Sequence, residues 1–376
     1  MAFSSYRNKG ILANWWWTMD KTLLICISIL IFLGIVLTFS ASPAVATRIG
    51  FGNYHFIKRH LFFAPIAYFV MIAFSMQKLK TIRRAALIGY VLAMGLMVLT
   101  LFFGEANKGA SRWLIVFGFS LQPSEFVKPL FIVTAAWLFD GQRQNPEFPG
   151  NYISMALFFV TAGLILRQPD IGMAVVVTAV WGFQFFLSGM PILLIALAAI
   201  AMVVALVGAY FIFPHFQTRI HQFLASGDDL SYQVKKSLEA FQSGNLFGRG
   251  PGEGIVRSSI PDAHTDFIYA VAGEEYGVFL CLTIVLLYAI IVIRSMILSC
   301  KDNNLFIILS ASGLAVSFGL QSIINMASTL HLIPTKGMTL PFISYGGSSI
   351  VATAIGMGML LAITRKNVHA EDKDDV

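Results

Sequence analysis

The sequence predicts an all-α, polytopic membrane protein with about ten transmembrane helices. Of its 376 residues, 57% are hydrophobic and 12% are charged, which is the composition of a membrane protein rather than of a soluble domain. Apolar runs long enough to cross a bilayer recur about ten times along the chain. Lys and Arg gather in alternate short connections, so the positive-inside rule places both termini in the cytoplasm.

Two groups of predicted spans flank one large polar connection. A cytoplasmic N-terminal segment covers residues 1–22, and a cytoplasmic tail covers residues 364–376. Helices one to seven fall within residues 23–213, a large extracytoplasmic loop covers residues 214–265, and helices eight to ten fall within residues 266–363. The predicted spans are Leu23–Ser40, His60–Met76, Ala85–Gly104, Glu125–Phe139, Ile153–Leu166, Ile171–Leu187, Ile192–Phe213, Asp266–Ile293, Leu305–Met326 and Ser348–Ile363.

Composition and motifs also exclude several classes of protein. The three cysteines lie in or beside apolar runs, so no disulfide framework is expected. The sequence has no His/Cys metal-ligand spacing, no nucleotide-binding loop and no Gly-x-Ser-x-Gly motif, so we expect no such metal site and no ATP-driven transport. The net charge of +7 suits membrane lipids or an anionic ligand, or serves topology alone, and no nucleic-acid partner is expected.

The polar stretch before the eighth predicted span places titratable side chains at the membrane surface. Asp262, His264 and Asp266 fall within about one helical turn of each other. We expect Pro261 to be the first residue of the helix, where its missing N–H costs nothing. A carboxylate at this point can act as a base toward a bound hydroxyl group. The alternative is that Asp262 caps the helix and His264 binds a loop.

Two further acids follow inside the apolar run. If the helix continues at about 1.5 Å per residue, Glu274 and Glu275 lie about 12 Å deeper than Asp266. Ionisable groups cost roughly 2.5–3.5 kcal/mol each near a bilayer centre, so a chain that keeps them usually needs them. A flexible or tightly turned backbone is predicted just upstream by Gly244, Gly248, Gly250, Gly252 and Gly254.

A second group of polar residues surrounds the start of the fourth predicted span. Arg112 suits a bidentate phosphate clamp, and Lys108 and Lys128 suit point charges. Glu125, which follows Gln122 in the motif Gln-Pro-Ser-Glu, stands three residues before Lys128, so the two can neutralise each other. The alternative is an internal ion pair together with an interfacial Arg-Trp anchor.

A third group is the Pro- and Gly-bounded segment before the last predicted span. It runs from Pro334 through Ser344 and into the sequence Gly346-Gly347-Ser348. Such a segment exposes backbone N–H groups and lets a ligand approach closely. Small residues at the start of a span also allow tight helix packing, which is an equally good interpretation.

Taken together and in this order, these blocks resemble the SEDS family (shape, elongation, division and sporulation) of bacterial cell-wall proteins, to which RodA and FtsW belong. The resemblance covers nearly the whole chain from the first predicted span onward. The stretch Pro261–Phe267 and the segment Pro334–Gly347 are most similar to the division branch, FtsW. The pair Ser258-Ser259 departs from the pattern, because some division-type members carry a glutamate there. The resemblance is strongest in Lys108–Trp113, Gln122–Lys128, Tyr232–Gly250, Pro261–Glu275 and Lys336–Ser349.

This resemblance implies a peptidoglycan glycosyltransferase that polymerises lipid II on the outer face of the bacterial cytoplasmic membrane. Asp266 matches the essential acidic residue of the family and would take the proton from the acceptor hydroxyl in an inverting reaction. Undecaprenyl pyrophosphate would leave, with its charge compensated by Arg112, Lys108 or Lys128, or by a divalent cation (Mg²⁺ or Mn²⁺). The implied substrate-binding residues are Lys108, Arg112, Gln122, Glu125, Lys128, His264, Thr265, Ser344, Gly346 and Gly347.

The resemblance also implies partners and a place in the cell. A class B penicillin-binding transpeptidase and other division proteins would act with this chain at the division septum. Two other functions stay open on the residues alone. A lipid II transporter would use Glu125, Lys128, Glu274 and Glu275 as a proton relay, and a division scaffold would not need the acidity of Asp266.

Overall fold

The computed structural model describes residues 10–107, 110–116, 118–189, 214–224 and 230–366, together with residues 200, 204, 207, 208, 210 and 211. The helices are α1 (Ile11–Thr18), α2 (Lys21–Arg48), α3 (His55–Ser75), α4 (Leu79–Phe103), α5 (Pro123–Gln144), α6 (Gly150–Arg167), α7 (Ile171–Leu187), α9 (Pro214–Leu224), α10 (Tyr232–Gly244), the 3₁₀ helix η3 (Val256–Ser259), α11 (Ile268–Ser299), α12 (Leu305–Thr329) and α13 (Gly347–Ile363). The strands are β1 (Glu105–Asn107), β2 (Ala110–Val116) and β3 (Phe119–Leu121).

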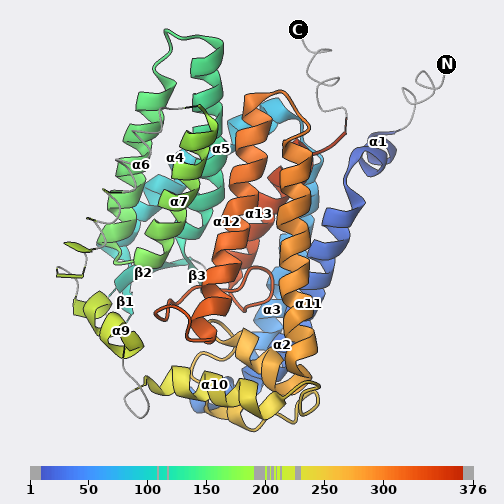
Figure 1. Ribbon diagram of the computed structural model, residues 1–376, viewed down its shortest axis with the longest axis vertical. Helices are drawn as coiled ribbons and strands as arrows, with labels where there is room; N and C mark the ends of the chain where they lie inside the picture. The colour runs from blue at the N-terminus through green and yellow to red at the C-terminus, as the bar shows by residue number, and fades with distance from the viewer. Residues whose placement is uncertain are drawn as a thin grey trace.

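Long helices run side by side through the molecule. Helix α1 and the C-terminal end of α13 lie at one end of this bundle, and α10 lies at the other (Figure 1). Among the described residues, six helices are long and apolar enough to cross a membrane, namely α2, α3, α4, α6, α11 and α12, and α7 and α13 are shorter apolar helices. The predicted helical membrane protein is therefore confirmed. The predicted seventh span, Ile192–Phe213, falls largely outside the described residues, and every other predicted span overlaps a described helix.

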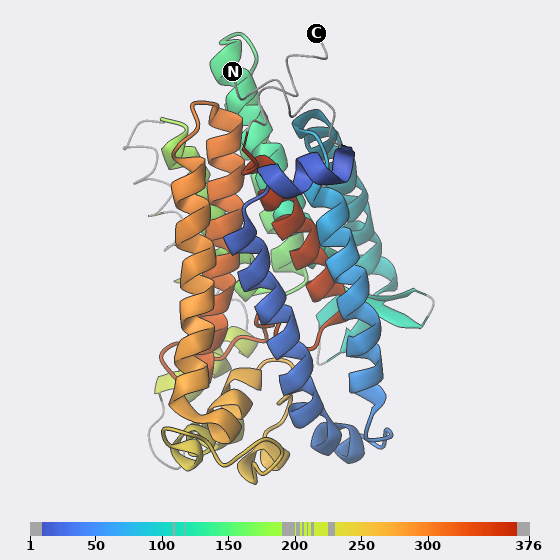
Figure 2. The same cartoon turned by 90° about the vertical axis from the view of Figure 1, so that its right-hand side faces the viewer.

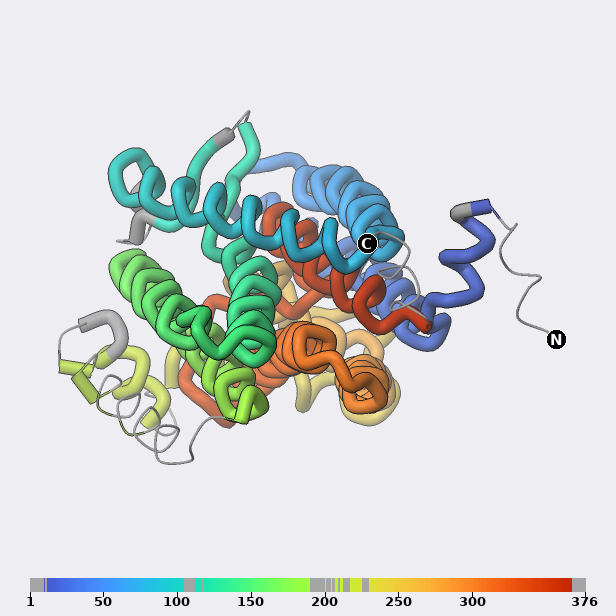
Figure 3. Tube along the Cα trace, turned by 90° about the horizontal axis from the view of Figure 1, so that it is seen from above, coloured from blue at the N-terminus to red at the C-terminus, as the bar shows by residue number. Residues whose placement is uncertain are grey.

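Helix α13 forms the centre of the bundle. It lies between α3 on one side and α5 and α12 on the other (Figure 3). Two glycines permit its close contact with α3, because a Cβ at Gly358 would lie 2.6 Å from the Met71 carbonyl oxygen and a Cβ at Gly347 would lie 2.8 Å from the Phe63 ring. The tight-packing interpretation of Gly347 is thus supported by its neighbours.

The all-α prediction was wrong in one respect, because a small antiparallel sheet joins α4 to α5. Its order is β1-β2-β3, with Leu114 paired to Leu121 and Val116 paired to Phe119. The turn between β2 and β3 contains Gly118 at φ +80°, a value that glycine adopts without strain. The sheet lies beside α3 (Figure 2). Phe62 of α3 and Phe119 of β3 stack with ring centroids 5.8 Å apart.

The predicted helix start at Pro261 was also wrong. Residues 261–267 form consecutive turns, and α11 begins at Ile268. Asp262 has φ 54°, and its carbonyl accepts the N–H groups of Thr265 (3.1 Å) and Asp266 (3.2 Å). The left-handed conformation at Asp262 prevents the helix from starting there. Asp266 therefore stands on an irregular segment immediately before α11.

Helix α11 is broken at Gly277, which has φ 74°. A Cβ at Gly277 would lie 2.3 Å from the Leu246 carbonyl oxygen, and a Cβ at Gly248 would lie 2.1 Å from the Glu275 carbonyl oxygen. The backbone of the predicted glycine-rich turn thus packs so closely against the break that neither Gly248 nor Gly277 could carry a side chain. The break follows both acids, so Glu274 and Glu275 stand on the short helical segment of residues 268–276 and not on the long segment of α11 after Gly277.

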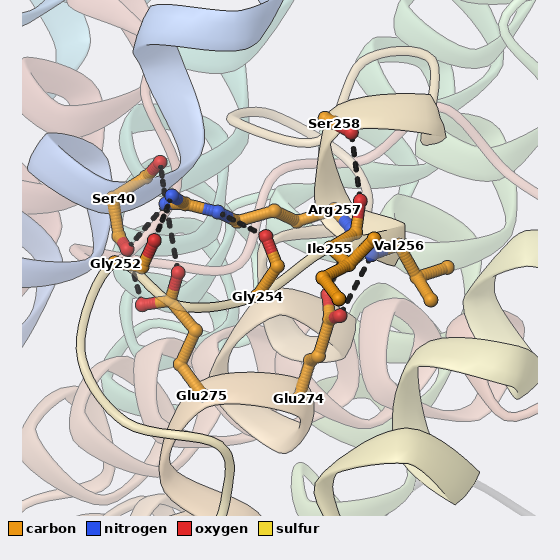
Figure 4. A network of polar contacts seen from close by, with 9 residues as sticks. All are labelled: Ser40, Gly252, Gly254, Ile255, Val256, Arg257, Ser258, Glu274 and Glu275. Carbon is orange, nitrogen blue, oxygen red and sulfur yellow. Dashed lines mark hydrogen bonds and ion pairs between the residues drawn. The ribbon is translucent and has the colours of Figure 1, made fainter.

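Both acids bind the connection of residues 245–260, here called the outer loop because it lies at the end of the bundle away from α1, as Figure 4 shows. The two carboxylate oxygens of Glu274 accept the N–H groups of Val256 and Arg257, each at 2.7 Å. Arg257 forms an ion pair with Glu275 at 2.7 Å and donates to the Ser40 hydroxyl on α2 at 2.8 Å. Glu274 and Glu275 are 0% and 1% exposed. These contacts tie α2, the glycine-rich loop and the first segment of α11 together.

We expect Arg257→Ala to destabilise the protein by about 3–5 kcal/mol, because it leaves a buried carboxylate without its cation. The melting temperature in detergent, followed by intrinsic tryptophan fluorescence, measures this loss. The matched control is Lys236→Ala, which removes the exposed Lys236–Glu239 ion pair of 2.6 Å and leaves the melting temperature unchanged. Equal melting temperatures for the Arg257 variant and the wild type would contradict this account of the outer loop.

Candidate functional site

A cleft of about 470 Å³ opens at the end of the bundle that carries the sheet and α9. Its lining combines cations, carboxylates and small or aromatic residues. The lining residues are Arg59, Phe63, Arg112, Trp113, Phe119, Ser120, Gln122, Glu125, Pro169, Arg219, Asp262, Thr265, Asp266, Gly337, Thr339, Tyr345, Gly346, Gly347, Ser348 and Ser349. Segments that lie far apart in the sequence therefore meet at one polar surface.

The half-buried Asp266 reaches this cleft from the turn before α11. It faces the segment between α12 and α13, because a Cβ at Gly337 would lie 3.3 Å from the Asp266 Oδ2 atom. The absence of a side chain at Gly337 keeps the approach to the carboxylate open on that side. A group in this position can accept a proton from a ligand hydroxyl that enters the cleft.

Arg112 on β2 lies at the cleft wall and binds the turn between α6 and α7. Its Nε donates to the Gln168 carbonyl at 2.7 Å, and its Nη2 donates to the Pro169 carbonyl. Its Nη1 lies 3.6 Å from Asp170 Oδ2. Because Nε and part of Nη2 are already engaged, Arg112 offers a fixed positive charge and its remaining N–H groups rather than a free guanidinium fork.

Two more cations, Arg219 on α9 and Lys336 before α13, add positive potential. Arg219 donates to the Thr335 carbonyl at 3.1 Å. Burial, followed by the nearby Arg112, lowers the pKa of Arg219, while Asp266 and Asp170 act in the opposite direction. Burial and then the charge of Arg219 lower the pKa of Lys336 to about 8, against the attraction of Asp170. The cleft therefore holds positive charges that repel one another and that a bound anion would stabilise.

The N-terminus of α13 forms another part of the lining. Residues Gly346, Gly347, Ser348 and Ser349 all reach the cleft. The first N–H groups of a helix have no acceptor within the helix, so they favour an anion or a polar ligand group. This arrangement agrees with the predicted exposure of backbone N–H groups at Gly346-Gly347.

The structure brings together part of the predicted set of site residues. Those that line the cleft are Arg112, Gln122, Glu125, Thr265, Asp266, Gly346 and Gly347. Lys108 lies outside the described residues. Lys128 does not line the cleft; its Nζ donates to Glu125 Oε2 at 2.9 Å and to Gln321. The predicted Glu125–Lys128 ion pair is present, and only its Glu125 member lines the cleft.

His264 and Ser344 lie behind the cleft surface. The His264 ring packs between Phe56 (4.3 Å between centroids) and Tyr345 (5.3 Å). Burial lowers the pKa of His264 to about 4, although Asp262 opposes the shift, so the ring is neutral at physiological pH. The Ser344 hydroxyl donates to the Thr265 carbonyl. Both side chains hold the site segments together from behind.

Sequence reasoning missed Arg59 and Arg219 as site residues. Arg59 lies on α3 near Phe119, and Arg219 is the only formally charged residue of α9. Nothing local distinguishes either arginine from an interfacial cation. Within the described residues, no group of three or more His, Cys, Asp or Glu side chains could hold a metal ion.

The fold and the cleft define a multi-pass membrane protein with a polar, cation-rich site at one end of its bundle. A family model described as cell cycle protein, covering FtsW, RodA and SpoVE, matches residues 20–369. The chain therefore belongs to the FtsW/RodA/SpoVE family, which confirms the SEDS resemblance.

Individual relatives are similar over most of their length. The probable peptidoglycan glycosyltransferase FtsW of Caulobacter vibrioides is 43% identical over 365 residues, covering 96% of this chain and 93% of the relative. The protein of the same name from Trichlorobacter lovleyi is 35% identical over 358 residues, covering 92% and 93%. A solved chain described under the structural coordination of polymerization and crosslinking by a peptidoglycan synthase complex has a TM-score of 0.75 at 26% identity, covering 92% and 97%. The rod shape determining protein RodA of Thermus thermophilus, at 23% identity and a TM-score of 0.68 over 93% and 97%, shares the fold.

We expect anion binding to weaken as the pH rises through the lowered pKa of Lys336. The lysine is protonated below about pH 8 and loses its charge above it, so a pyrophosphate ion must draw a proton onto the lysine at higher pH. Calorimetry with inorganic pyrophosphate should show affinity falling about tenfold between pH 7 and pH 9, relative to Lys336→Arg. Arginine keeps its charge over this range, and identical pH profiles for both proteins would overturn the prediction.

Proposed function

We propose that this chain is a division-type peptidoglycan glycosyltransferase that polymerises lipid II into glycan strands. The observation that carries the proposal is the position of Asp266 in a polar cleft that also contains Arg59, Arg112 and Arg219. A carboxylate beside several cations suits a reaction in which a hydroxyl group is deprotonated while an anionic leaving group departs. The names of the FtsW relatives support the same activity.

In the proposed mechanism, Asp266 is the general base. Its carboxylate takes the proton from the 4-hydroxyl of the acceptor's N-acetylglucosamine. The resulting oxygen nucleophile forms a bond to the anomeric carbon of the donor's N-acetylmuramic acid. The bond from that carbon to the pyrophosphate oxygen breaks, and undecaprenyl pyrophosphate leaves with the electron pair. A single displacement inverts the configuration at the anomeric carbon.

The leaving group acquires negative charge, and the cations of the cleft would stabilise it. Arg112 and Arg219 line the same cleft, and Arg219 binds the carbonyl of Thr335, the residue before Lys336. The first turn of α13 adds backbone N–H groups. A divalent cation would also fit, since Mg²⁺ is usually held by one or two carboxylates together with substrate phosphates, and Asp262 and Asp266 both reach the cleft. Such an ion would supply further charge compensation.

We further propose that the cleft faces the outside of the bacterial cytoplasmic membrane, with both termini inside and the protein at the division septum. The lysine and arginine pattern of the short connections supports this orientation. A class B penicillin-binding transpeptidase is the proposed partner, supported by the similarity to a chain from a peptidoglycan synthase complex. Lipid II would then be bound from the outer leaflet.

Asp266→Asn should lower the rate of glycan synthesis by about 10²–10⁴-fold, because the amide cannot accept the proton. The measurement is polymer formation from labelled lipid II by the purified protein with its cognate transpeptidase. Glu239→Gln is the matched control, since it removes an exposed carboxylate on α10 that does not line the cleft.

The variants separate three outcomes. Loss of polymer in Asp266→Asn with synthesis retained in Glu239→Gln supports the assignment of the base. Near-normal synthesis by Asp266→Asn excludes it. No polymer from the wild type, with the partner bound and competent lipid II supplied, favours a lipid II transporter or a division scaffold.

A further inference from the structure

Three consecutive backbone carbonyls before α11 are bound by donors from the C-terminal part of the chain. They belong to His264, Thr265 and Asp266. Their donors are, in the same order, the Tyr345 N–H at 2.9 Å, the Ser344 hydroxyl and the Asn325 side-chain amide at 3.0 Å. Three carbonyls of the irregular segment that carries Asp266, including that of Asp266 itself, are therefore held by other elements.

Asn325 differs from the other two donors in its position and in its number of partners. It lies on α12, within the bundle, and is 0% exposed. The Nδ2 atom that binds the Asp266 carbonyl also donates to the Met338 carbonyl at 2.6 Å. One buried amide therefore links the turn before α11 to the segment before α13.

These two segments both line the cleft beside the Asp266 carboxylate. Met338 follows Gly337, whose missing side chain faces Asp266 Oδ2, and it is two residues from Lys336. A change in the separation of the two carbonyls that Asn325 bridges would change the position of Asp266 relative to Gly337 and Lys336. A displacement of about 1 Å at a reacting group can cost about 100-fold in rate.

We propose that Asn325 is a positioning residue that fixes the Asp266 carboxylate by binding the Asp266 and Met338 carbonyls simultaneously. Asn325 does not line the cleft among the described residues, so it acts through Asp266 rather than on a substrate. This inference rests on the proposed role of Asp266 as the base. Asn325 belongs to none of the three polar groups that the sequence draws attention to.

The test compares Asn325→Asp and Asn325→Ala with the wild type. Aspartate has nearly the same shape but places an oxygen opposite two carbonyl oxygens, and alanine removes the amide altogether. We expect kcat for glycan synthesis to fall by about 10- to 100-fold in both variants, with KM for lipid II changed less than about threefold. The matched control is Thr329→Val, which removes a buried hydroxyl one turn further along α12 whose bond to the Met326 carbonyl stays within the helix. The control should retain the wild-type kcat.

A second measurement does not depend on catalysis. The peptide that covers residues 262–268 should exchange its amide hydrogens faster in Asn325→Ala than in the wild type and in Thr329→Val. Each protein is measured at the same interval below its own melting temperature. Unchanged exchange, or a wild-type kcat in both Asn325 variants while Asp266→Asn is inactive, would overturn the inference. An inactive wild type would instead count against the proposed function, and the exchange result would still decide whether Asn325 orders this segment.

Discussion

Backbone polar groups that lie outside helices near a membrane must find partners within the protein, and this requirement organises the region around Asp266. The turns of residues 261–267 have their last carbonyls bound by Tyr345, Ser344 and Asn325. On the neighbouring elements, Arg112 binds the carbonyls between α6 and α7, and Glu274 binds two N–H groups of the outer loop. Charged side chains in this part of the chain, such as Arg112 and Glu274, thus bind backbone groups of the protein itself.

The helices could be predicted from the sequence where apolar length and local signals coincide. Helix α7 has the predicted bounds, Ile171–Leu187, because Asp170 caps its first turn through the Met173 N–H. The helix start at Pro261 failed because donors almost 80 residues away favour the turns, and no local pattern reveals such donors. The break at Gly277 was missed for the same reason, since it depends on the packing of Gly248 against Glu275.

The candidate site was predictable in so far as its residues stand in polar blocks that interrupt apolar runs. Asp266, Arg112 and Gly346 reach the cleft from three such blocks. His264 looks like a ligand group in the sequence, yet its ring is buried against Phe56. Arg219 shows the opposite case, because a surface-like arginine becomes part of the site only through the tertiary fold. The sequence indicates the chemical type of each site residue, but it does not indicate the direction in which the side chain points.

The length of α2 has a consequence for the height of the site above the lipid. Its 28 residues extend about 42 Å at about 1.5 Å per residue, and the hydrocarbon core of a bilayer is about 30 Å thick. Ser40 is reached after about 30 Å, so a bilayer whose hydrocarbon core begins at Lys21 would end near the contacts of Arg257 and Glu275 with α2. In a thicker bilayer the outer loop and the cleft would sit lower among the headgroups. The thickness of the bilayer would thereby set the distance between the phosphate of a membrane-anchored ligand and the Asp266 carboxylate.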